Sequence, residues 1–338
     1  MLTKSIVFTA KNTSEFIEEN IPEMKENEVT VRLVRSAISA GTERANITGD
    51  PNTSIYSNEL NYSFPRYGGY SSAGIVEAVG SEVRSVKPGD RVALSWSLHK
   101  ERCVAKESRV YKLPDNVSYG AAALVHIATF PAAAIRKCRL EFGESALVMG
   151  FGVLGIIALK ILRAAGASPI IVADPVKEKR ELAIKHGADF ALNPLDENFA
   201  KEVKEITGGG AAVAIEVTGI GAGLDGALDC MRKFGRVALL GCTRNSDFSI
   251  DYYRKVHGPG ITLIGAHTLA RPDKESHGGW WTEREEALAL INLIDTGRLD
   301  FDSLIEEVHS PFEHKEVYER LVKERSFPII EFDWSGLE

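Results

Sequence analysis

The sequence predicts an α/β protein in which a doubly wound parallel sheet is joined to a barrel-like β domain. Residues 145–160 pass from a short apolar run through three closely spaced glycines into a helix-like pattern. After residue 146, β-branched runs alternate with helix-like runs, which is typical of βαβ units on a parallel sheet. Before residue 124, short alternating runs rich in Val, Ile and Gly indicate strands of a barrel-like domain.

The three glycines have the spacing of a dinucleotide-binding turn of the Rossmann type. Gly150 would permit the sharp turn, Gly152 would let a pyrophosphate approach the backbone, and Gly155 would let the helix pack on the strand. The helix would then begin at Val153 and Leu154 with free N–H groups directed at the phosphates.

Asp174 ends the next β-branched run, about twenty residues past the glycines, where the dinucleotide fingerprint has an acid. Its carboxylate would accept hydrogen bonds from both ribose hydroxyls of an adenosine and would repel a 2′-phosphate, so NAD(H) is favoured over NADP(H). Asp174 before Pro175 also fits a helix N-cap, and both roles can coexist.

Length and composition allow two domains and exclude several classes of protein. A chain of 338 residues with 44% hydrophobic residues can bury a large core. The net charge of −7 comes without a basic run, so nucleic acid and anionic membranes are not expected partners. The sequence shows neither a bilayer-spanning apolar segment nor a signal-peptide pattern, so we expect a cytoplasmic protein.

The four cysteines form no Cys-x-x-Cys pair, and each is expected to be a small buried hydrophobe.

The individual elements follow from the local patterns. Expected strands lie at 5–8, 28–34, 74–80, 91–95, 109–113, 169–174, 189–192, 212–218, 236–241 and 261–265. Expected helices beyond the glycine turn lie at 176–187, 197–207, 285–296 and 313–323. Thr218, Gly241 and His267 stand at or just past strand ends, where open α/β sheets bind their ligands, and are assigned to the cofactor.

Several motifs resemble the medium-chain dehydrogenase/reductase superfamily, the zinc alcohol and polyol dehydrogenases and their relatives, over essentially the whole chain. Residues 39–43 stand where that family has a Cys-Gly-Thr-Asp motif, and residues 69–80 where it has Gly-His-Glu-x-x-Gly-x-Val-x-x-Val-Gly. The resemblance implies a GroES-like catalytic β domain at 1–124, an NAD-binding Rossmann domain at 125–267 and a return segment at 268–338 that completes the catalytic domain. It also implies an active site between the lobes and a homodimer joined through the strand at 261–265.

The family's zinc-ligand positions are the main departure from the resemblance. Ala40 replaces the Cys, Tyr70 replaces the His, and His126 falls at the place of the third ligand. Because alanine has no donor atom and a neutral phenol is a poor zinc ligand, we expect no catalytic zinc of the usual kind.

Without a metal, the reacting oxygen needs other hydrogen-bond donors. Thr42 matches the family's proton-relaying hydroxyl, and Thr42, Tyr70 and His126 are the predicted catalytic residues. Each also has a simpler explanation: Tyr70 could pack beside its glycines, His126 could pack at a helix start, and Thr42 could bond the turn backbone. Glu43, at the place of the family's ligand-orienting acid, is assigned to the substrate site.

A polar and aromatic segment follows the strand at 261–265. Arg271 and Glu275 would bind hydroxyl groups, and Trp280 with Trp281 would stack on the face of a sugar or polyol. In the family this segment lies near the nicotinamide and the substrate cleft. The alternative is that the two tryptophans begin the next helix and pack under it.

We therefore expect an NAD(H)-dependent oxidoreductase that interconverts a secondary alcohol of a small polyol or sugar derivative and its ketone. Three alternatives stay open. One alternative is a metal-free quinone or enone reductase. Such an enzyme would prefer NADPH, whereas Asp174 favours NADH. A dinucleotide-binding sensor would bind NAD(H) without turnover. A rebuilt metal site would use His126 and Glu43 with His99 or His267.

Overall fold

The computed structural model describes residues 2–54, 57–243 and 248–337. It confirms the predicted α/β class and divides into two compact units. The first unit combines Met1–Ile127 with Ala287–Glu338, and the second unit is Ala128–Glu286. Residues 268–286, which the sequence assigned to the return segment, are therefore part of the second unit.

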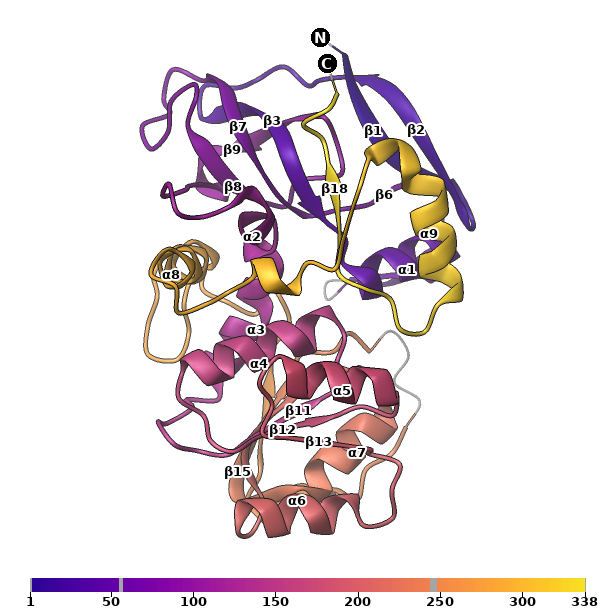
Figure 1. Ribbon diagram of the computed structural model, residues 1–338, viewed down its shortest axis with the longest axis vertical. Coiled ribbons are helices and arrows are strands. Elements are labelled where there is room, and N and C mark those ends of the chain that lie inside the picture. The colour runs from indigo at the N-terminus through magenta and orange to yellow at the C-terminus, as the bar shows by residue number, and fades with distance from the viewer. Residues whose placement is uncertain (1, 55–56, 244–247, 338) are drawn as a thin grey trace. The chain divides into compact units, whose positions relative to one another are not determined.

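The first unit is built mainly on antiparallel strands. Its largest sheet has the order β10-β8-β7-β3-β18-β17, with β9 also paired to β3, and a smaller sheet has the order β2-β1-β6. The bounds are β1 Leu2–Ala10, β2 Thr13–Asn20, β3 Glu28–Ala37, β4 Asn52–Ser54, β5 Ser57–Asn61, β6 Arg66–Tyr67, β7 Ser71–Val79, β8 Arg91–Ser95, β9 Arg102–Lys106, β10 Val110–Lys112, β17 Glu307–His309 and β18 Ile330–Asp333. Figure 1 shows the C-terminal strand β18 lying beside β3 from the N-terminal part of the chain.

Alternation of side chains explains why these runs form strands with one buried face. Val29, Val31 and Leu33 of β3 are fully buried, and the residues between them are partly exposed, as the two-residue period of a strand requires. They share one hydrophobic core with Phe332 of β18 and with Trp334.

Helices cover parts of the first unit. Their bounds are α1 Ala40–Thr48, α2 Tyr119–Ala123 and α9 His314–Lys323, while α3 Val125–Lys137 and α8 Glu283–Asp295 each run across a boundary between the units. The sequence prediction missed α1, because its residues show almost no amphipathic pattern. The helix ends at Gly49, whose φ of 80° lies in the left-handed region that glycine favours.

The second unit holds a six-stranded sheet with the order β13-β12-β11-β14-β15-β16, in which every neighbouring pair is parallel. This is the doubly wound order, with its switch point between β11 and β14. The bounds are β11 Ala146–Met149, β12 Ile170–Ala173, β13 Phe190–Leu192, β14 Ala211–Glu216, β15 Met231–Leu239 and β16 Thr262–Gly265. The helices between them are α4 Val153–Ala164, α5 Lys177–Lys185, α6 Phe199–Thr207 and α7 Gly221–Asp229.

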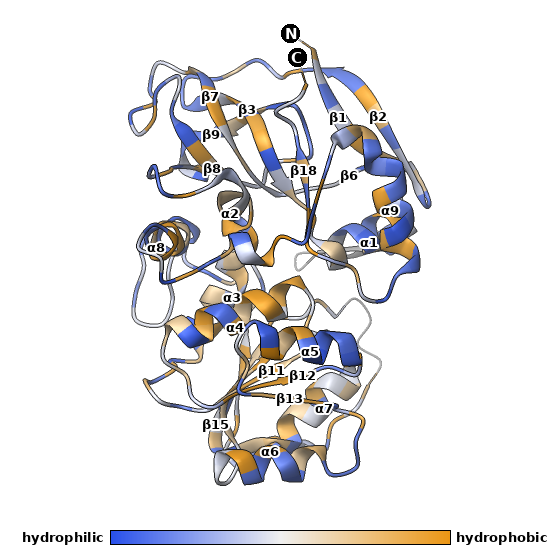
Figure 2. Cartoon of the chain, in the orientation of Figure 1, coloured by the Kyte–Doolittle hydropathy of each residue, from blue (hydrophilic) through white to orange (hydrophobic). Residues whose placement is uncertain are grey.

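Burial in the second unit follows the rule for parallel sheets. All residues of β11 and β12 are buried, since helices cover both faces of the sheet. Figure 2 shows these strands as hydrophobic, whereas α5 carries a large hydrophilic surface. The sheet thus holds the β11–α4 turn on a rigid base.

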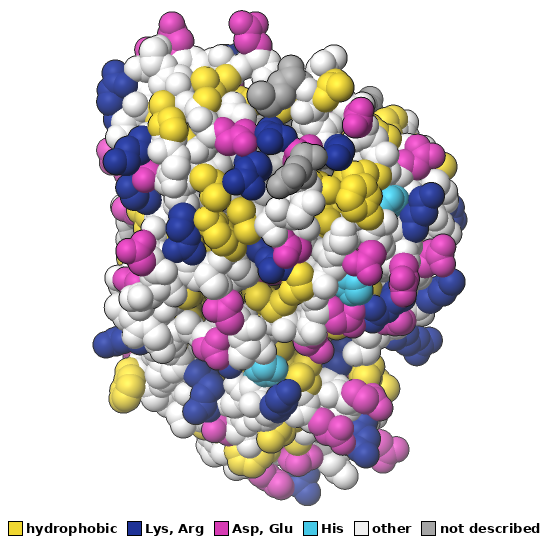
Figure 3. Space-filling view, turned by 45° about the horizontal axis from the view of Figure 1, so that its top comes forward, with side chains coloured by type: hydrophobic (Ala, Val, Ile, Leu, Met, Phe, Trp, Pro, Cys, Tyr) yellow, Lys and Arg dark blue, Asp and Glu magenta, His cyan; other side chains and the backbone are white. Residues whose placement is uncertain are grey.

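The outer surface carries charges of both signs. On the face in Figure 3, Lys and Arg side chains are interspersed with Asp and Glu. Among the described residues, no helix is long and apolar enough to cross a bilayer.

Candidate functional site

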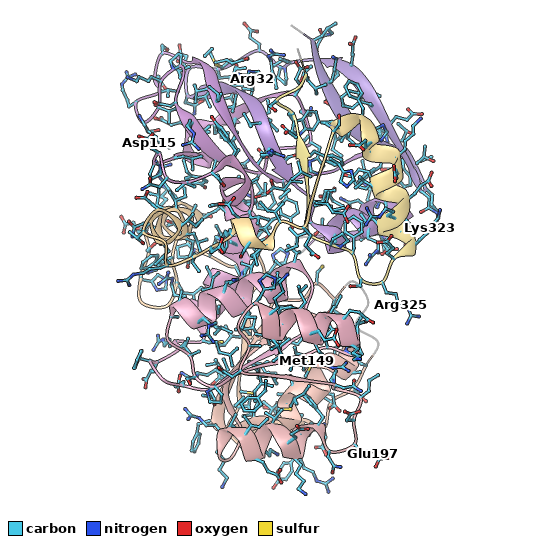
Figure 4. All side chains as sticks on the ribbon, viewed as in Figure 1. Arg32, Asp115, Met149, Glu197, Lys323 and Arg325 are labelled. Atoms are coloured by element: carbon cyan, nitrogen blue, oxygen red, sulfur yellow. The ribbon has the colours of Figure 1, made fainter. Side chains whose placement is uncertain are left out.

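The turn between β11 and α4 has the geometry that the glycine spacing predicted. Met149, labelled in Figure 4, ends β11, and Gly150 follows with a φ of 99°. A Cβ on Gly155 would lie 2.2 Å from the carbonyl oxygen of Gly150, so only glycine lets α4 begin this close to the strand. A Cβ on Gly152 would meet no atom of the described residues within 4 Å, which leaves space beside the first N–H groups of α4.

Asp174 follows β12 beside this turn. It is 5% exposed, and its two carboxylate oxygens accept hydrogen bonds from the backbone N–H of Phe151 at 2.8 Å and of Val176 at 2.9 Å. Asp174 thereby joins the glycine turn to the start of α5. It is not the N-cap of that helix, because that position belongs to Val176.

The end of β14 brings an acid that the sequence prediction did not single out. Glu216 is buried, and its carboxylate accepts hydrogen bonds from the N–H and hydroxyl of Thr218 and from the N–H of Gly219. Burial raises the pKa of Glu216 above its usual range. Gly241 approaches the same turn, since a Cβ there would lie 2.2 Å from the nitrogen of Gly219. A single acid closing the apolar run 211–216 was the available signal.

The segment after β16 packs on the end of α3 within the second unit. The guanidinium of Arg136 lies 3.4 Å from the ring centre of Trp281, and the ammonium of Lys137 lies 4.7 Å from that of Trp280. The tryptophans therefore do not begin α8, which starts at Glu283. These two cation–π contacts attach this segment to α3 within the second unit.

The remaining polar residues of this segment lie nearby. Arg271 donates to the hydroxyl of Thr129 at 3.4 Å, and His267 accepts a hydrogen bond from the N–H of Leu269 at 3.2 Å. Burial and the charges of Lys137 and Arg271 lower the pKa of His267.

In the first unit, Tyr70 lies just before β7 and is joined to two hydroxyl side chains. Its phenol donates a hydrogen bond to Ser39, and it also interacts with the side chain of Thr42 in the first turn of α1. Burial raises the pKa of Tyr70 to about 12, although the hydrogen bonds to Ser39 and Thr42 act in the opposite direction. Tyr70 therefore stays protonated at neutral pH, and the exposed Thr42 connects it to solvent.

His126 lies against the same tyrosine. Its ring centre is 5.7 Å from that of Tyr70 and 4.8 Å from that of Trp96, both in edge-to-face arrangements. Trp96 is 36% exposed and has a φ of 59°, an unusual conformation for a bulky residue. The structure thus brings Thr42, Tyr70 and His126 together and adds Ser39 and Trp96, which the sequence did not single out. Of these two, only Ser39 had a signal in the sequence, because it is the first residue of the 39–43 motif.

Glu43 differs from the expectation that it faces the substrate. It is 1% exposed, and its carboxylate accepts hydrogen bonds from Ser39 N–H at 2.8 Å, His99 Nε2 at 3.0 Å and the Tyr318 hydroxyl at 2.6 Å. The other ring nitrogen of His99 hydrogen-bonds to Ser36 at 2.7 Å, and Ser36 also accepts from Trp334. We call Ser36, Glu43, His99, Tyr318 and Trp334 the buried network. It fixes the N-terminal turn of α1, which carries Thr42.

One cysteine also differs from the expectation. Cys103, Cys138 and Cys230 are buried as predicted, but Cys242 is exposed, because it follows β15 in the loop beyond the carboxyl end of the sheet.

Two family descriptions match the chain. "Alcohol dehydrogenase GroES-like domain" matches residues 25–139, and "Zinc-binding dehydrogenase" matches residues 153–277. The chain therefore belongs to the medium-chain dehydrogenase/reductase superfamily. Within it, the protein is an alcohol-dehydrogenase-like oxidoreductase.

Individual relatives align along nearly the whole chain. The L-threonine 3-dehydrogenase of Pyrococcus abyssi is 27% identical over 90% of this chain and 91% of its own length. The D-guloside 3-dehydrogenase of Escherichia coli K12 is 26% identical over 90% of this chain and 92% of its own. The crystal structure of galactitol-1-phosphate dehydrogenase from Escherichia coli, at 19% identity, superposes with a TM-score of 0.84 over 98% of this chain and 99% of that one, which shows the shared fold.

The zinc in the second family description does not fit the residues at the ligand positions. Ala40 offers no donor atom, and Tyr70 is held protonated with its hydroxyl bonded to Ser39 and Thr42. Across residues 2–54, 57–243 and 248–337, no three His, Cys, Asp or Glu side chains gather as a metal site, and Glu43 is bound to His99 and Tyr318.

Proposed function

We propose that the protein is an NAD(H)-dependent dehydrogenase that interconverts a secondary alcohol of a polyol or sugar derivative and its ketone without the usual catalytic zinc. The observation that carries this proposal is the protonated hydroxyl of Tyr70, held by Ser39 and Thr42 at a position where the family has a zinc ligand. A hydrogen-bond donor there would take over the task of stabilising charge on the reacting oxygen.

The reaction needs one hydride and one proton. NAD, when bound, would accept the hydride from the carbinol carbon. In alcohol oxidation, Tyr70 would pass its own proton through Thr42 to solvent as it takes the proton of the substrate hydroxyl. In ketone reduction, Tyr70 would donate its proton to the oxygen as the hydride arrives, and Thr42, which is exposed, would return a proton from solvent. The buried His126 would orient the ring of Tyr70 through their edge-to-face contact.

The cofactor assignment is supported by the second unit. The open space at Gly152 suits a pyrophosphate, and Val153, Leu154 and Gly155 place N–H groups at the start of α4. Asp174 puts a negative charge beside this turn, which suits the two hydroxyls of the NAD ribose and disfavours a 2′-phosphate. Thr218, Gly241 and His267 lie at or beyond the carboxyl ends of β14, β15 and β16, the edge where a dinucleotide would lie.

The substrate class is supported by the relatives, whose names describe dehydrogenases of threonine, a guloside and sorbitol. All three named compounds carry a hydroxyl group on a secondary carbon. Arg271 and Trp280 would bind the polar and ring faces of such a substrate.

The first experiment combines metal analysis with a cofactor titration on the same untagged, chelator-free sample. We expect zinc far below one atom per chain, and NADH fluorescence that titrates to a single site with weaker binding of NADPH. A panel of polyols and sugars with NAD then tests turnover. Zinc near one per chain would refute the metal-free mechanism, and tight NADH binding without any turnover would favour the sensor alternative.

We also propose a homodimer through β16. This strand is at the edge of the sheet, and three of its four residues are exposed, so its backbone is available to pair with a second copy. Light scattering of the wild type should give twice the chain mass, and Leu263→Pro, which removes a backbone donor, should give a monomer.

A further inference from the structure

A buried lysine lies outside the catalytic group described above. Lys137, the last residue of α3, is 6% exposed. Its ammonium donates to the carbonyl oxygen of Gly265 at 3.3 Å and lies over the ring of Trp280. An ammonium has three N–H donors, and this contact uses one of them.

The charge of Lys137 is not neutralised by an ion pair, and the nearby Glu286 is paired with Arg136 instead. Arg136 pairs with Glu286 at 2.7 Å, and Arg271 has Glu283 at 4.0 Å. Lys137 takes part in no ion pair within residues 2–54, 57–243 and 248–337. Burial and the charge of Arg271 together lower the pKa of Lys137 to about 8, and the attraction of Glu286 is the smaller effect. Burying a cation beside another cation is costly unless an anion joins them.

The position of this charge is at the ligand-binding edge of the sheet. Gly265 is the last residue of β16, so Lys137 lies at the carboxyl ends of the parallel strands. Arg271, whose side chain is 7% exposed, interacts electrostatically with both Lys137 and His267. The side chains of Lys137, Arg271 and His267 thus lie near one another at this edge of the sheet.

A purely structural role explains less. A methionine would pack on the ring of Trp280 without the cost of burying a charge and would lose only the hydrogen bond to the carbonyl oxygen of Gly265. The choice of a lysine at a buried position needs an additional reason.

We propose that Lys137 and Arg271 form a subsite for an anionic group of the substrate. The substrate would then be a sugar or polyol derivative that carries a carboxylate or a phosphate, both of which present oxygens to paired cationic donors. This inference rests on the proposed dehydrogenase function and narrows its substrate class.

The test compares matched substrates in the full-length protein. D-Glucitol, D-gluconate and D-glucitol 6-phosphate are assayed with NAD in the wild type and in Lys137→Met, with the exposed Lys201→Met as a matched control. We expect kcat/KM for the charged substrate to fall about 10- to 100-fold in Lys137→Met, the loss of one charge-assisted hydrogen bond, with the neutral substrate and the control unchanged. If Lys137→Met lowers kcat/KM for D-gluconate, the subsite binds a carboxylate; if it lowers kcat/KM for D-glucitol 6-phosphate, the subsite binds a phosphate. Equal changes for neutral and charged substrates would overturn the proposal.

A binding measurement separates this proposal from the proposed function. Calorimetry with inorganic phosphate and with D-gluconate, on NADH-loaded protein, should show binding that Lys137→Met and Lys137→Gln weaken about tenfold or more. Such weakening without turnover of any substrate would keep the subsite and reject the dehydrogenase. Turnover of neutral polyols, with neither anion bound, would keep the dehydrogenase and reject the subsite. Thermal unfolding and NADH affinity, unchanged in both variants, show that each still folds.

Discussion

The candidate cofactor site of the second unit is shaped by backbone atoms, whereas the candidate catalytic site of the first unit is shaped by side chains. Around the β11–α4 turn, the shape comes from backbone: Gly150, Gly152 and Gly155 decide how close strand, helix and ligand can lie. Around Tyr70, the shape comes from side chains, with Ser39, Thr42 and His126 packed on one phenol.

This difference explains why one site matches the family's pattern and the other departs from it. A backbone turn is disrupted by almost any side chain that replaces its glycines. The glycine pattern is therefore kept, and it can be recognised in the sequence. A side-chain site can exchange metal ligands for a phenol and an alanine while the surrounding strands keep their pairing. The fold therefore survives a change in the chemistry that it carries.

The largest expected effect is at Gly155. In Gly155→Ala, the new Cβ would lie 2.2 Å from the backbone oxygen of Gly150, so the turn must shift and NADH affinity should fall more than 100-fold. Overpacking of this kind also destabilises by about 1–3 kcal/mol, which thermal unfolding would show.

Gly152→Ala is the matched control for this site. Its Cβ meets no atom within 4 Å in the part of the chain that the structure describes, so the unfolding temperature should not change. NADH affinity should fall, because the methyl group enters the proposed ligand space. Wild-type affinity in Gly152→Ala would show that the pyrophosphate does not bind at this turn.

The next effect is at Tyr70. Tyr70→Phe removes the phenol proton but keeps the ring against His126, so kcat should fall about 100-fold or more, as for loss of a general acid. NADH affinity, measured by fluorescence, should stay at the wild-type value, since the cofactor turn is untouched.

Thr42→Ala sharpens this test. It leaves Tyr70 bonded to Ser39 but removes the exposed hydroxyl, so we expect a smaller loss of kcat, about tenfold. A kcat unchanged in both variants would assign Tyr70 to packing, the simpler explanation.

The third effect concerns the buried network. Glu43→Gln replaces a carboxylate that accepts from His99, Tyr318 and Ser39 by an amide that must donate to one of them, so stability should fall by about 2–4 kcal/mol. Urea denaturation measures the loss. Glu197→Gln, an exposed position labelled in Figure 4, is the control and should change stability by less than about 0.5 kcal/mol.

The smallest effect concerns Glu331 of β18. Its side chain is fully buried, neither carboxylate oxygen has a hydrogen-bond partner among the described residues, and burial raises its pKa well above 4.5. Because the folded state holds this proton more tightly than the unfolded state, stability should decline as pH rises above 4.5 toward the folded-state pKa.

Glu331→Gln removes that dependence. Its stability should match the wild type at pH 5 and exceed it by about 1–2 kcal/mol at pH 8, in unfolding curves recorded at both values. A variant less stable than the wild type at pH 8 would mean that the ionised carboxylate is stabilised by Arg35 after all.

Local patterns were enough to predict most of the second unit, although α7 was missed. Its buried strands are continuous apolar runs and its helices repeat a period of about 3.6 residues, so β12, α5, α6 and β16 lie within a few residues of the expected ranges. The pattern failed where structure depends on long-range contacts. The strands β2 and β9 were missed because polar or charged residues break their alternation, and their pairing with β1 and β3 stabilises them instead.

The candidate sites divide in the same way. The glycine spacing and Asp174 are local signals in the sequence. The contacts among Ser39, Tyr70 and Trp96, in contrast, involve residues up to 57 positions apart, from Ser39 to Trp96. Glu43 shows the limit most clearly: its motif pointed toward a reaction, but its partners His99 and Tyr318 lie 56 and 275 positions away and hold it in the interior.

The buried network would also make the proposed metal-free site difficult to convert into a zinc site. Restoring a cysteine at Ala40 and a histidine at Tyr70 would return two donors, but the acid that should orient the new histidine is already committed to His99 and Tyr318. Withdrawing it would leave buried donors without an acceptor in the middle of a β core. An engineer, or an evolving lineage, would have to rebuild that network as well as the two ligand positions before a zinc ion could bind in the family's way.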